Sequence, residues 1–441
     1  MDSSKLVQSG LIAAAVAALI SVAGATELAA VPAFARQTGL SCNQCHPSTM
    51  IAPGFTYTGK LFRMRGYRTP NLGERMQVNP GKWGGLDVSI NDYFSWFFRL
   101  MPYSQSRNPG TTAINKSYPL YLTQSIFYVG PVTPYAGVWL EIYFQNAQPG
   151  RSETIEQSFA NVNELEFVIA KDVGDNILAF QLTNRGGADG TGPFWWPFLG
   201  QRLWDHDIGV GPSPGQLGVY GYFNRLVYTY FGVSPGGDNR DWNNGMNYFA
   251  NLALSPMRED LNELWLNLEY NAGNDQVPLV NARQRNSGTD NAYFYSFGIP
   301  VAGIPAKQTA SFSRVHSEVR YNTVDRGPHT LETALMFSKS KDNYRDGSKA
   351  SIDQWGAWAR YMYQRKAGVA LGLYNRFNYN YDDGAGTVTK IDVKPTWDVY
   401  LWLQPAMNFQ PGISYRPTFS HSLAGPAQKG YSFWIFANVL Y

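Results

Sequence analysis

Residues 86–100 read LDVSINDYFSWFFRL and alternate apolar with polar side chains along most of their length. The apolar positions are Leu86, Val88, Ile90, Phe94, Trp96 and Phe98. Successive side chains of a β-strand point to opposite faces, so this alternation predicts a strand with one apolar face and one polar face. Residues 367–377 and 391–403 repeat the pattern, as does the C-terminal stretch 431–441. The decisive signal for the fold is therefore a two-residue period.

The same alternation recurs at intervals to the end of the chain, broken by turn-forming residues. The predicted strands are 86–100, 118–130, 133–146, 161–171, 175–184, 217–233, 244–254, 261–272, 311–322, 329–340, 353–365, 367–377, 391–403, 405–420 and 429–441. The tyrosine-rich stretch 292–297 supplies one more candidate strand. Because single-chain bacterial barrels use even strand numbers, we predict about sixteen strands, with about fourteen as the alternative.

A soluble β-sandwich is the competing interpretation, and three features favour a transmembrane antiparallel β-barrel over residues 86–441. Aromatic residues crowd the ends of predicted strands, as in the girdles at a membrane interface. Long connections such as 184–217 and 272–311 alternate with short ones. The last strand ends on Tyr441, which resembles the C-terminal signal of outer-membrane barrels. The aromatic residues concerned are Phe194, Trp195, Trp196, Trp265, Trp355, Trp397 and Trp402.

The composition supports an all-β membrane protein and argues against a nucleic-acid-binding protein and against a helical membrane protein. Aromatic residues make up 15% of the chain and charged residues only 16%. The net charge is +3 with no basic run, which gives no reason to expect nucleic-acid binding. No segment after the N-terminal region offers about 18 consecutive apolar residues, so helical membrane spans are not expected.

The N-terminus has the features of a secretory signal peptide, predicted over residues 1–25. Lys5 lies in a short polar start, residues 11–22 are apolar, and Ala23-Gly24-Ala25 is a plausible cleavage site. The alternative is a retained membrane anchor, although the apolar stretch is short for a bilayer about 30 Å thick. We therefore predict export from the cytoplasm.

The two cysteines of the chain, Cys42 and Cys45, are followed directly by His46 in the motif C-N-Q-C-H. Two thiols at this spacing reach the two vinyl groups of one porphyrin, and the adjacent imidazole serves as the proximal ligand of the iron. A thioredoxin-like C-x-x-C or a small disulfide loop are the competing interpretations, but no βαβ pattern surrounds the motif. The sequence predicts one covalently bound haem c, with His46 as its iron ligand.

The sixth iron ligand is open, with Met50, Met64 and Met76 as candidates near in sequence. Met64 is the candidate we select, since it lies in residues 54–67, where Phe55, Thr58, Phe62 and Arg65 recur at helical spacing. The alternative is that this helix only packs Phe55 and Phe62 on the porphyrin. Residues 26–85 are too few to wrap a haem with their own core, so we predict a helical, haem-binding plug inside the barrel.

The segment PAFARQTG at residues 32–39, followed by CNQCH at 42–46, resembles the outer-membrane monohaem cytochrome c–porin fusion family of iron-oxidising bacteria. Gly54, Phe55, Gly59, Phe62, Gly66 and Tyr67 are similar to the aromatic–glycine helix that follows the haem in that family. The resemblance implies electron transfer from an extracellular donor, typically Fe(II), to a periplasmic soluble cytochrome or cupredoxin. For Arg36 it implies either a position near a haem propionate or a contact at the helix entry or the barrel wall.

Three functions follow from this sequence as hypotheses. The first is an electron conduit in the bacterial outer membrane, for which no catalytic acid–base residue is needed. The alternative is a solute porin whose haem is a structural or sensing element. The third is a haem enzyme, which has the least support because the haem segment contains no second histidine. Acidic residues of the predicted wall attract cations or are ordinary lumen positions; they are Glu164, Glu166, Glu263 and Glu269.

Overall fold

The computed structural model describes three N-terminal helical segments and a set of long strands. The described residues are 32–38, 40, 42–45, 55–70, 93–107, 112–117, 123–145, 161–183, 216–235, 246–259, 262–274, 293–294, 299–302, 309–323, 328–344, 347–364, 366–390, 396–405, 409–422 and 428–440. The predicted signal peptide 1–25, His46, Met50, Met76 and the aromatic group 194–196 lie outside these residues, and so does the first half of the predicted strand 86–100.

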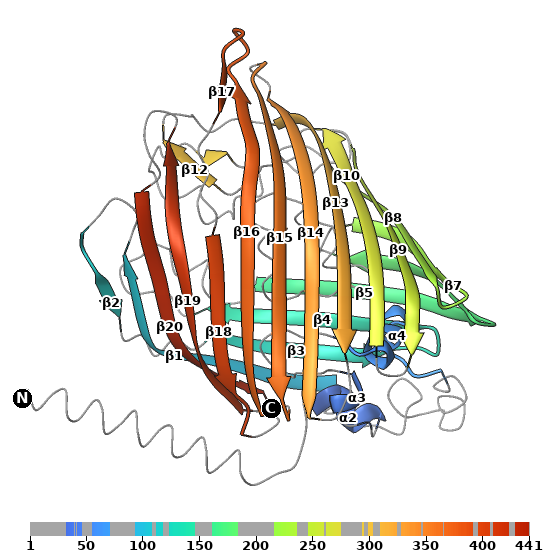
Figure 1. Ribbon diagram of the computed structural model, residues 1–441. Helices are drawn as coiled ribbons and strands as arrows, with labels where there is room; N and C mark the ends of the chain where they lie inside the picture. The colour runs from blue at the N-terminus through green and yellow to red at the C-terminus, as the bar shows by residue number, and fades with distance from the viewer. Residues whose placement is uncertain are drawn as a thin grey trace, which may run out of the picture.

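Within the described chain, 16 long strands form a closed antiparallel β-barrel (Figure 1). Each strand pairs with the next long strand along the chain, and β20 closes the ring by pairing with β1, with Leu100 opposite Ala437. The strands are β1 (Phe94–Arg107), β3 (Thr123–Pro131), β4 (Ala136–Gln145), β5 (Asn161–Val173), β6 (Asn176–Thr183), β7 (Gln216–Phe223), β8 (Val227–Pro235), β9 (Met246–Glu259), β10 (Asn262–Asn274), β13 (Thr309–Thr323), β14 (His329–Tyr344), β15 (Lys349–Tyr363), β16 (Ala367–Asp382), β18 (Thr396–Leu403), β19 (Phe409–Ser422) and β20 (Gln428–Leu440).

Four short strands lie outside this ring order. They are β2 (Asn115–Ser117), β11 (Tyr293–Phe294), β12 (Ile299–Ala302) and β17 (Val388–Lys390). Three helices precede the barrel, namely α2 (Pro32–Thr38), α3 (Cys42–Cys45) and α4 (Tyr57–Met64). Each helix in the described part of the chain is too short to cross a bilayer.

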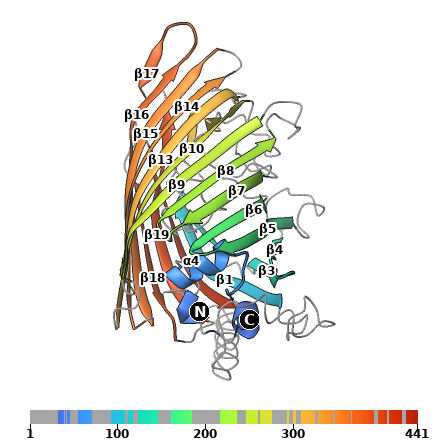
Figure 2. The same ribbon diagram turned by 90° about the vertical axis from the view of Figure 1, so that its right-hand side faces the viewer.

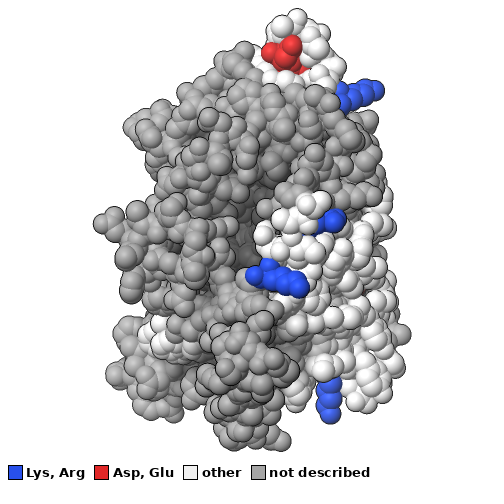
Figure 3. Space-filling model, turned by 90° about the vertical axis from the view of Figure 1, so that its left-hand side faces the viewer, with Lys and Arg blue, Asp and Glu red and all other residues white. Residues whose placement is uncertain are grey.

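The outer face of the barrel is apolar and the inner face is largely polar. On β14, Leu335 and Phe337 point outward and are 64% and 44% exposed, whereas Glu332 and Ser338 point inward and are buried. The outer face that Figure 3 shows carries only scattered charged side chains among the described residues. A closed barrel satisfies its backbone hydrogen bonds internally, and an apolar exterior matches hydrocarbon. The chain is therefore a bacterial outer-membrane barrel, as the alternation predicts.

The two ends of the barrel differ in the length of their connections. The connections 132–135, 174–175, 224–226, 260–261, 324–328, 364–366 and 404–408 are short and lie at one end, together with the end of β20. The described strands that are joined through 146–160, 184–215 and 275–308 have those ends at the opposite end of the barrel. Figures 1 and 2 show the three helices gathered at the short-connection end. Short connections of outer-membrane barrels face the periplasm, which places the helices at the periplasmic end.

Two details of the strand prediction are wrong although the number of strands is confirmed. The predicted single strand 217–233 is the hairpin β7–β8, which turns through Asn224 and Arg225 with φ of 49° and 52°. The turn residues Asn224, Arg225 and Leu226 include neither proline nor glycine, so the sequence on both sides of the turn resembles one continuous strand. The stretch 292–297 supplies only the two-residue strand β11, which pairs with β12 and not with the wall.

The tryptophans predicted to form aromatic girdles occupy both sides of the wall. Trp355 and Trp397 are 38% and 40% exposed on the outer face. Trp265 and Trp402 are 0% and 3% exposed and belong to clusters inside the barrel. Strand-end position alone therefore does not determine which side of the wall a tryptophan occupies.

Candidate functional site

Helix α4 is short and begins at a polar cap. The Oγ1 of Thr56 accepts a hydrogen bond from the backbone N–H of Gly59 at 3.1 Å, which is the usual role of an N-cap threonine. The helix ends at Arg65, and the chain then turns through Gly66 and Tyr67, both in the left-handed region. This confirms the helix predicted within residues 54–67. The face of α4 toward the wall buries Lys60, Phe62, Arg63 and Met64.

Cationic side chains of α4 and the residue after it bind acidic residues of the barrel wall from two sides. Lys60 forms a buried ion pair with Glu263 of β10. Arg63 Nη2 lies 3.0 Å from Glu166 of β5, and both side chains are nearly fully buried. Arg65 Nε lies 2.7 Å from Asp172, near the end of β5. The helix is thereby held inside the lumen between β5 and β10.

Glu166 is the most heavily bonded of these wall carboxylates. Its Oε2 accepts hydrogen bonds from Arg63 and, at 2.8 Å, from the hydroxyl of Tyr67. Its Oε1 accepts one from Gln181 of β6 at 2.8 Å. Burial, reinforced by the negative charge of Glu166, holds the pKa of Tyr67 well above its usual value. Tyr67 therefore keeps its proton, and its hydroxyl donates a hydrogen bond to the carboxylate.

Lys60 lies in a less polar setting. Its Nζ is 5.1 Å from the centre of the Trp265 ring, and the side chain is 2% exposed. Burial lowers the pKa of Lys60, and the neighbouring carboxylate of Glu263 opposes that shift. A lysine buried in this way depends on its acidic partner, because an unpaired buried charge is costly.

Met64 packs against the wall at the opposite end of α4 from its N-cap. Its side chain is 0% exposed and lies in a cluster with Val168, Ile177 and Tyr220. The hydroxyl of Tyr220 donates to the backbone carbonyl of Met64 at 2.7 Å. These contacts give Met64 a packing role, and its assignment as sixth iron ligand stays a prediction.

Helix α2 is attached to β1, β3 and β4, and β4 is the direct neighbour of β5 in the wall. The backbone N–H of Ala33 donates to Ser95 Oγ at 3.1 Å, and Gln37 Nε2 donates to the carbonyl of Val129 at 2.9 Å. Aromatic rings join α2 to the residues after α4: the Phe34 ring lies 5.5 Å from that of Tyr67, centre to centre. Trp139 of β4 completes this cluster at 5.8 Å from Tyr67.

The single helical turn α3 carries the two cysteines and packs directly on α4. The backbone N–H of Thr56 donates to the carbonyl of Cys45 at 2.9 Å, and its hydroxyl donates to the carbonyl of Gln44. A Cβ on Gly59 would lie only 2.3 Å from the carbonyl oxygen of Cys45. The close approach of α3 to α4 therefore requires glycine at this position.

These residues fit a covalently bound haem. Cys42 and Cys45 are the first and last residues of the helical turn α3. Cys45 is half-buried, and so are Phe55 and Tyr57 at the start of α4. His46 follows α3 directly in sequence, outside the described residues. Two cysteines at this spacing, followed directly by a histidine, are the donor set of the motif C-x-x-C-H.

Several solved structures have some similarity to this chain. OmpT of Vibrio cholerae matches 79% of this chain and 97% of its own, with 9% identity and a TM-score of 0.46. An anion-selective porin from Comamonas acidovorans matches 79% and 99%, with 10% identity and a TM-score of 0.46. OprB of Pseudomonas putida matches 79% and 93%, with 10% identity and a TM-score of 0.44. No protein-family model and no curated protein matches the sequence.

The four acidic residues that the sequence predicts in the wall differ in their surroundings. Glu166 and Glu263 bind the plug helix rather than lining an open solvent surface. Glu269 is 1% exposed and accepts a hydrogen bond from Asn267 at 2.7 Å. Glu164 lies in β5 and Arg36 in α2, and their side chains are outside the description.

The sequence analysis missed the cations that hold the plug. Lys60, Arg63 and Arg65 occur within six positions of one another, and they contact carboxylates more than a hundred residues away along the chain. Their one signal in the sequence is a basic helix in a chain whose other basic residues are scattered. Such a helix predicts an acidic docking surface, but not which strands supply it.

Proposed function

We propose that this outer-membrane barrel carries one covalently bound c-type haem at its periplasmic end and transfers electrons through it. The observation that supports the proposal is the position of the cysteine turn. α3 packs on α4, and α4 is ion-paired to β5 and β10 inside the lumen. A cofactor attached at Cys42 and Cys45 is thereby held at a fixed place in the barrel.

The residues of this chain then have defined tasks. Cys42 and Cys45 attach the porphyrin, and His46 holds the iron, as the motif implies. Gly59 and Thr56 fix the turn against α4, and Lys60, Arg63 and Tyr67 fix α4 to the wall. The bound haem supplies one-electron oxidation and reduction without acid–base catalysis. The donor proposed from the family resemblance is extracellular Fe(II).

The short-connection end places the cysteine turn toward the periplasm. That position suits electron delivery to a small periplasmic carrier, such as a soluble cytochrome or a cupredoxin. An extracellular donor then reaches the haem by way of the lumen. The inner face of the wall is polar at Asn251, Asn267 and Arg320, although these three side chains are buried among their neighbours.

Solute transport is the second candidate function, and the fold supports it more directly than electron transfer. A 16-stranded outer-membrane barrel with a polar interior is the architecture of a porin. In this case the haem is a structural or sensing element of the plug. The argument for electron transfer depends on residues 42–46, whereas the argument for porin activity depends on the barrel itself.

One experiment separates the two functions. Full-length protein is purified from outer membranes, and visible spectra are recorded anaerobically before and after addition of Fe(II). Appearance of a reduced c-type α-band supports electron transfer, and the Cys42→Ser/Cys45→Ser variant must lack it. A haem that dithionite reduces but Fe(II) does not excludes Fe(II) as donor. Steady ion conductance in planar bilayers together with an unreactive haem supports the porin function instead.

A further inference from the structure

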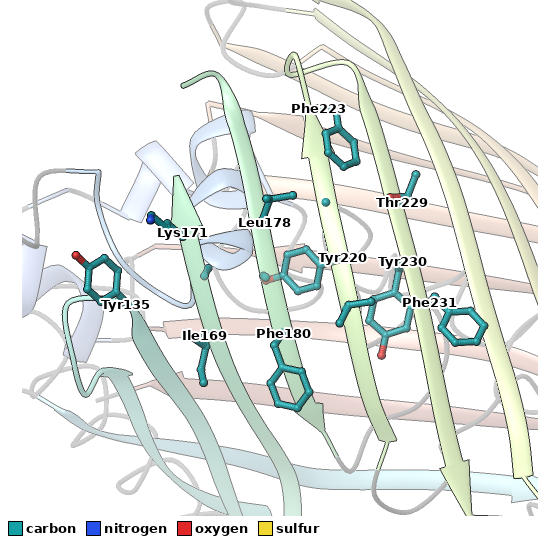
Figure 4. Close-up of a pocket in the computed structure, with 14 residues that line it drawn as sticks. Tyr135, Ile169, Lys171, Leu178, Phe180, Tyr220, Phe223, Thr229, Tyr230 and Phe231 are labelled. Carbon is teal, nitrogen blue, oxygen red and sulfur yellow. The ribbon is translucent and has the colours of Figure 1, made fainter. Parts of the chain in front are cut away.

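A groove crosses the outside of the barrel from β5 to β8, close to the periplasmic end (Figure 4). Its volume is about 910 Å³, which lies within the usual range for ligand sites. Four of its apolar side chains, Ile169, Phe180, Val219 and Phe231, are 44%, 40%, 54% and 51% exposed. They point away from the lumen, so the groove faces the membrane.

Two small residues, Gly221 and Thr229, interrupt the apolar outer face at the groove. Gly221 of β7 pairs with Leu178 of β6 and with Thr229 of β8, so one row of the outer face runs leucine, glycine, threonine. A Cβ on Gly221 would lie 2.4 Å from the ring of Phe223, which leans over the glycine. At Gly221 this row of residues therefore protrudes less from the outer face of the barrel than the phenylalanines beside it.

One end of the groove is polar. Lys171 and Tyr135 line it there, and Figure 4 shows these two side chains together at one side of the aromatic residues. Among the described residues that line the groove, Lys171 is the charged one. It lies two residues before the end of β5, and Tyr135 lies in the short connection between β3 and β4. Both therefore lie at the level of the periplasmic lipid head groups.

The acidic residues nearest in sequence do not neutralise Lys171. Asp172 points to the other side of the wall and pairs with Arg65 at 2.7 Å. Asp175 pairs with Arg225 of the neighbouring hairpin at 3.0 Å. The outer face thus presents an ammonium group and a phenol at the interface, directly above apolar surface. Lysines at this depth extend their charge toward head groups while their stems stay in hydrocarbon.

We propose that this groove binds one anionic phospholipid of the periplasmic leaflet. Lys171 and the Tyr135 hydroxyl bind its phosphate, and an acyl chain lies along Ile169, Phe180, Val219 and Phe231. The charge selects an anionic head group over a zwitterionic one, and the groove selects a lipid over a soluble phosphate. The site is independent of the haem and of the proposed electron transfer.

The test uses full-length protein in nanodiscs of equimolar phosphatidylcholine and phosphatidylglycerol. After re-extraction into detergent, native mass spectrometry counts the phosphatidylglycerol that stays bound. Lys171→Gln is expected to retain about fivefold less, equivalent to about 1 kcal/mol for one lysine at an anionic surface. The matched control is Lys366→Gln, an exposed lysine in another periplasmic connection, which is expected to retain the wild-type amount.

A second variant tests the apolar part of the groove. Val219→Trp fills it from an exposed position without entering the lumen and is expected to reduce retention of phosphatidylglycerol. Wild-type retention by Lys171→Gln would overturn the proposal, and so would equal loss in Lys366→Gln. Loss of phosphatidylcholine and phosphatidylglycerol in equal measure from Lys171→Gln would also overturn it, because the charge would then not select the lipid. Heat-modifiable gel migration establishes that each barrel is folded.

Discussion

The carbonyl oxygen of Cys45 lies 2.3 Å from the point that a Cβ on Gly59 would occupy. The Cδ1 of Phe55 lies 2.8 Å from the same point. Real Cβ atoms do not come this close to backbone, so α3 and α4 pack in this way only with glycine at position 59. This contact joins the cysteine turn to the helix that is fixed inside the barrel.

Gly59→Ala is therefore expected to displace α3 and to lower covalent haem content while the barrel still assembles. Haem staining of the denatured polypeptide measures attachment, and heat-modifiable migration measures barrel folding. Thr58→Ala is the matched control, because Thr58 is an exposed neighbour on the same helix. Normal haem content in Gly59→Ala would show that the contact does not position the cysteines.

Glu263→Gln is expected to release α4 from the wall. The change leaves Lys60 buried without its counter-charge, which costs about 3–5 kcal/mol for a buried pair. Trypsin cleavage after Arg63 measures the release, because that bond is protected while α4 is docked. The double variant Lys60→Met/Glu263→Met removes both charges and is expected to recover much of the protection.

The exposed pair Arg225–Asp175 is the comparison for this buried pair. Its side chains are 51% and 70% exposed, and such surface pairs contribute only about 0–1 kcal/mol. Asp175→Asn is expected to leave cleavage after Arg63 unchanged. Equal cleavage in Asp175→Asn and Glu263→Gln would contradict the prediction that the buried Lys60–Glu263 pair contributes more to holding α4 than an exposed pair does.

Tyr67→Phe is expected to weaken the plug by about 1–3 kcal/mol, because Glu166 loses one hydrogen bond in a buried site. Burial, and then the charge of Glu166, raise the pKa of Tyr67 above the ordinary value of about 10. The folded protein therefore binds this proton more tightly than the unfolded chain does. This difference stabilises the folded state below pH about 10, and the contribution is lost as the pH rises further. The difference in unfolding free energy between wild type and Tyr67→Phe should therefore shrink above pH about 10. Urea unfolding followed by tryptophan fluorescence measures it, and a difference that grows with pH would contradict the assignment.

Thr56→Ala is expected to reduce both helix stability and haem attachment. The variant loses the N-cap of α4, worth about 1 kcal/mol, and the hydrogen bond from the hydroxyl to the carbonyl of Gln44. Thr56→Ser keeps the hydroxyl and is expected to restore haem content and protection after Arg63. Failure of serine to restore them would assign the effect to the lost methyl group.

The barrel could be predicted because its signal is local. Alternation within one strand, as in residues 86–100 or 431–441, depends only on which side of the wall each side chain occupies. The turn at Asn224 and Arg225 was missed because its residues adopt positive φ without glycine. Trp265 and Trp402 were misplaced for a related reason: tryptophan suits both an interface and a buried aromatic cluster.

The sequence by itself determined the strand period, the closed outer-membrane class, the short helix after residue 54 and the cysteine motif at 42–46. Only the tertiary structure decided which wall residues hold that helix, because Lys60 and Glu263 are 203 positions apart. It also decided that Glu166 binds Arg63 and Tyr67 instead of facing solvent, and that the helices lie at the short-connection end. These relations depend on strand order and register around a closed ring, and a side chain's identity does not encode its distant partner.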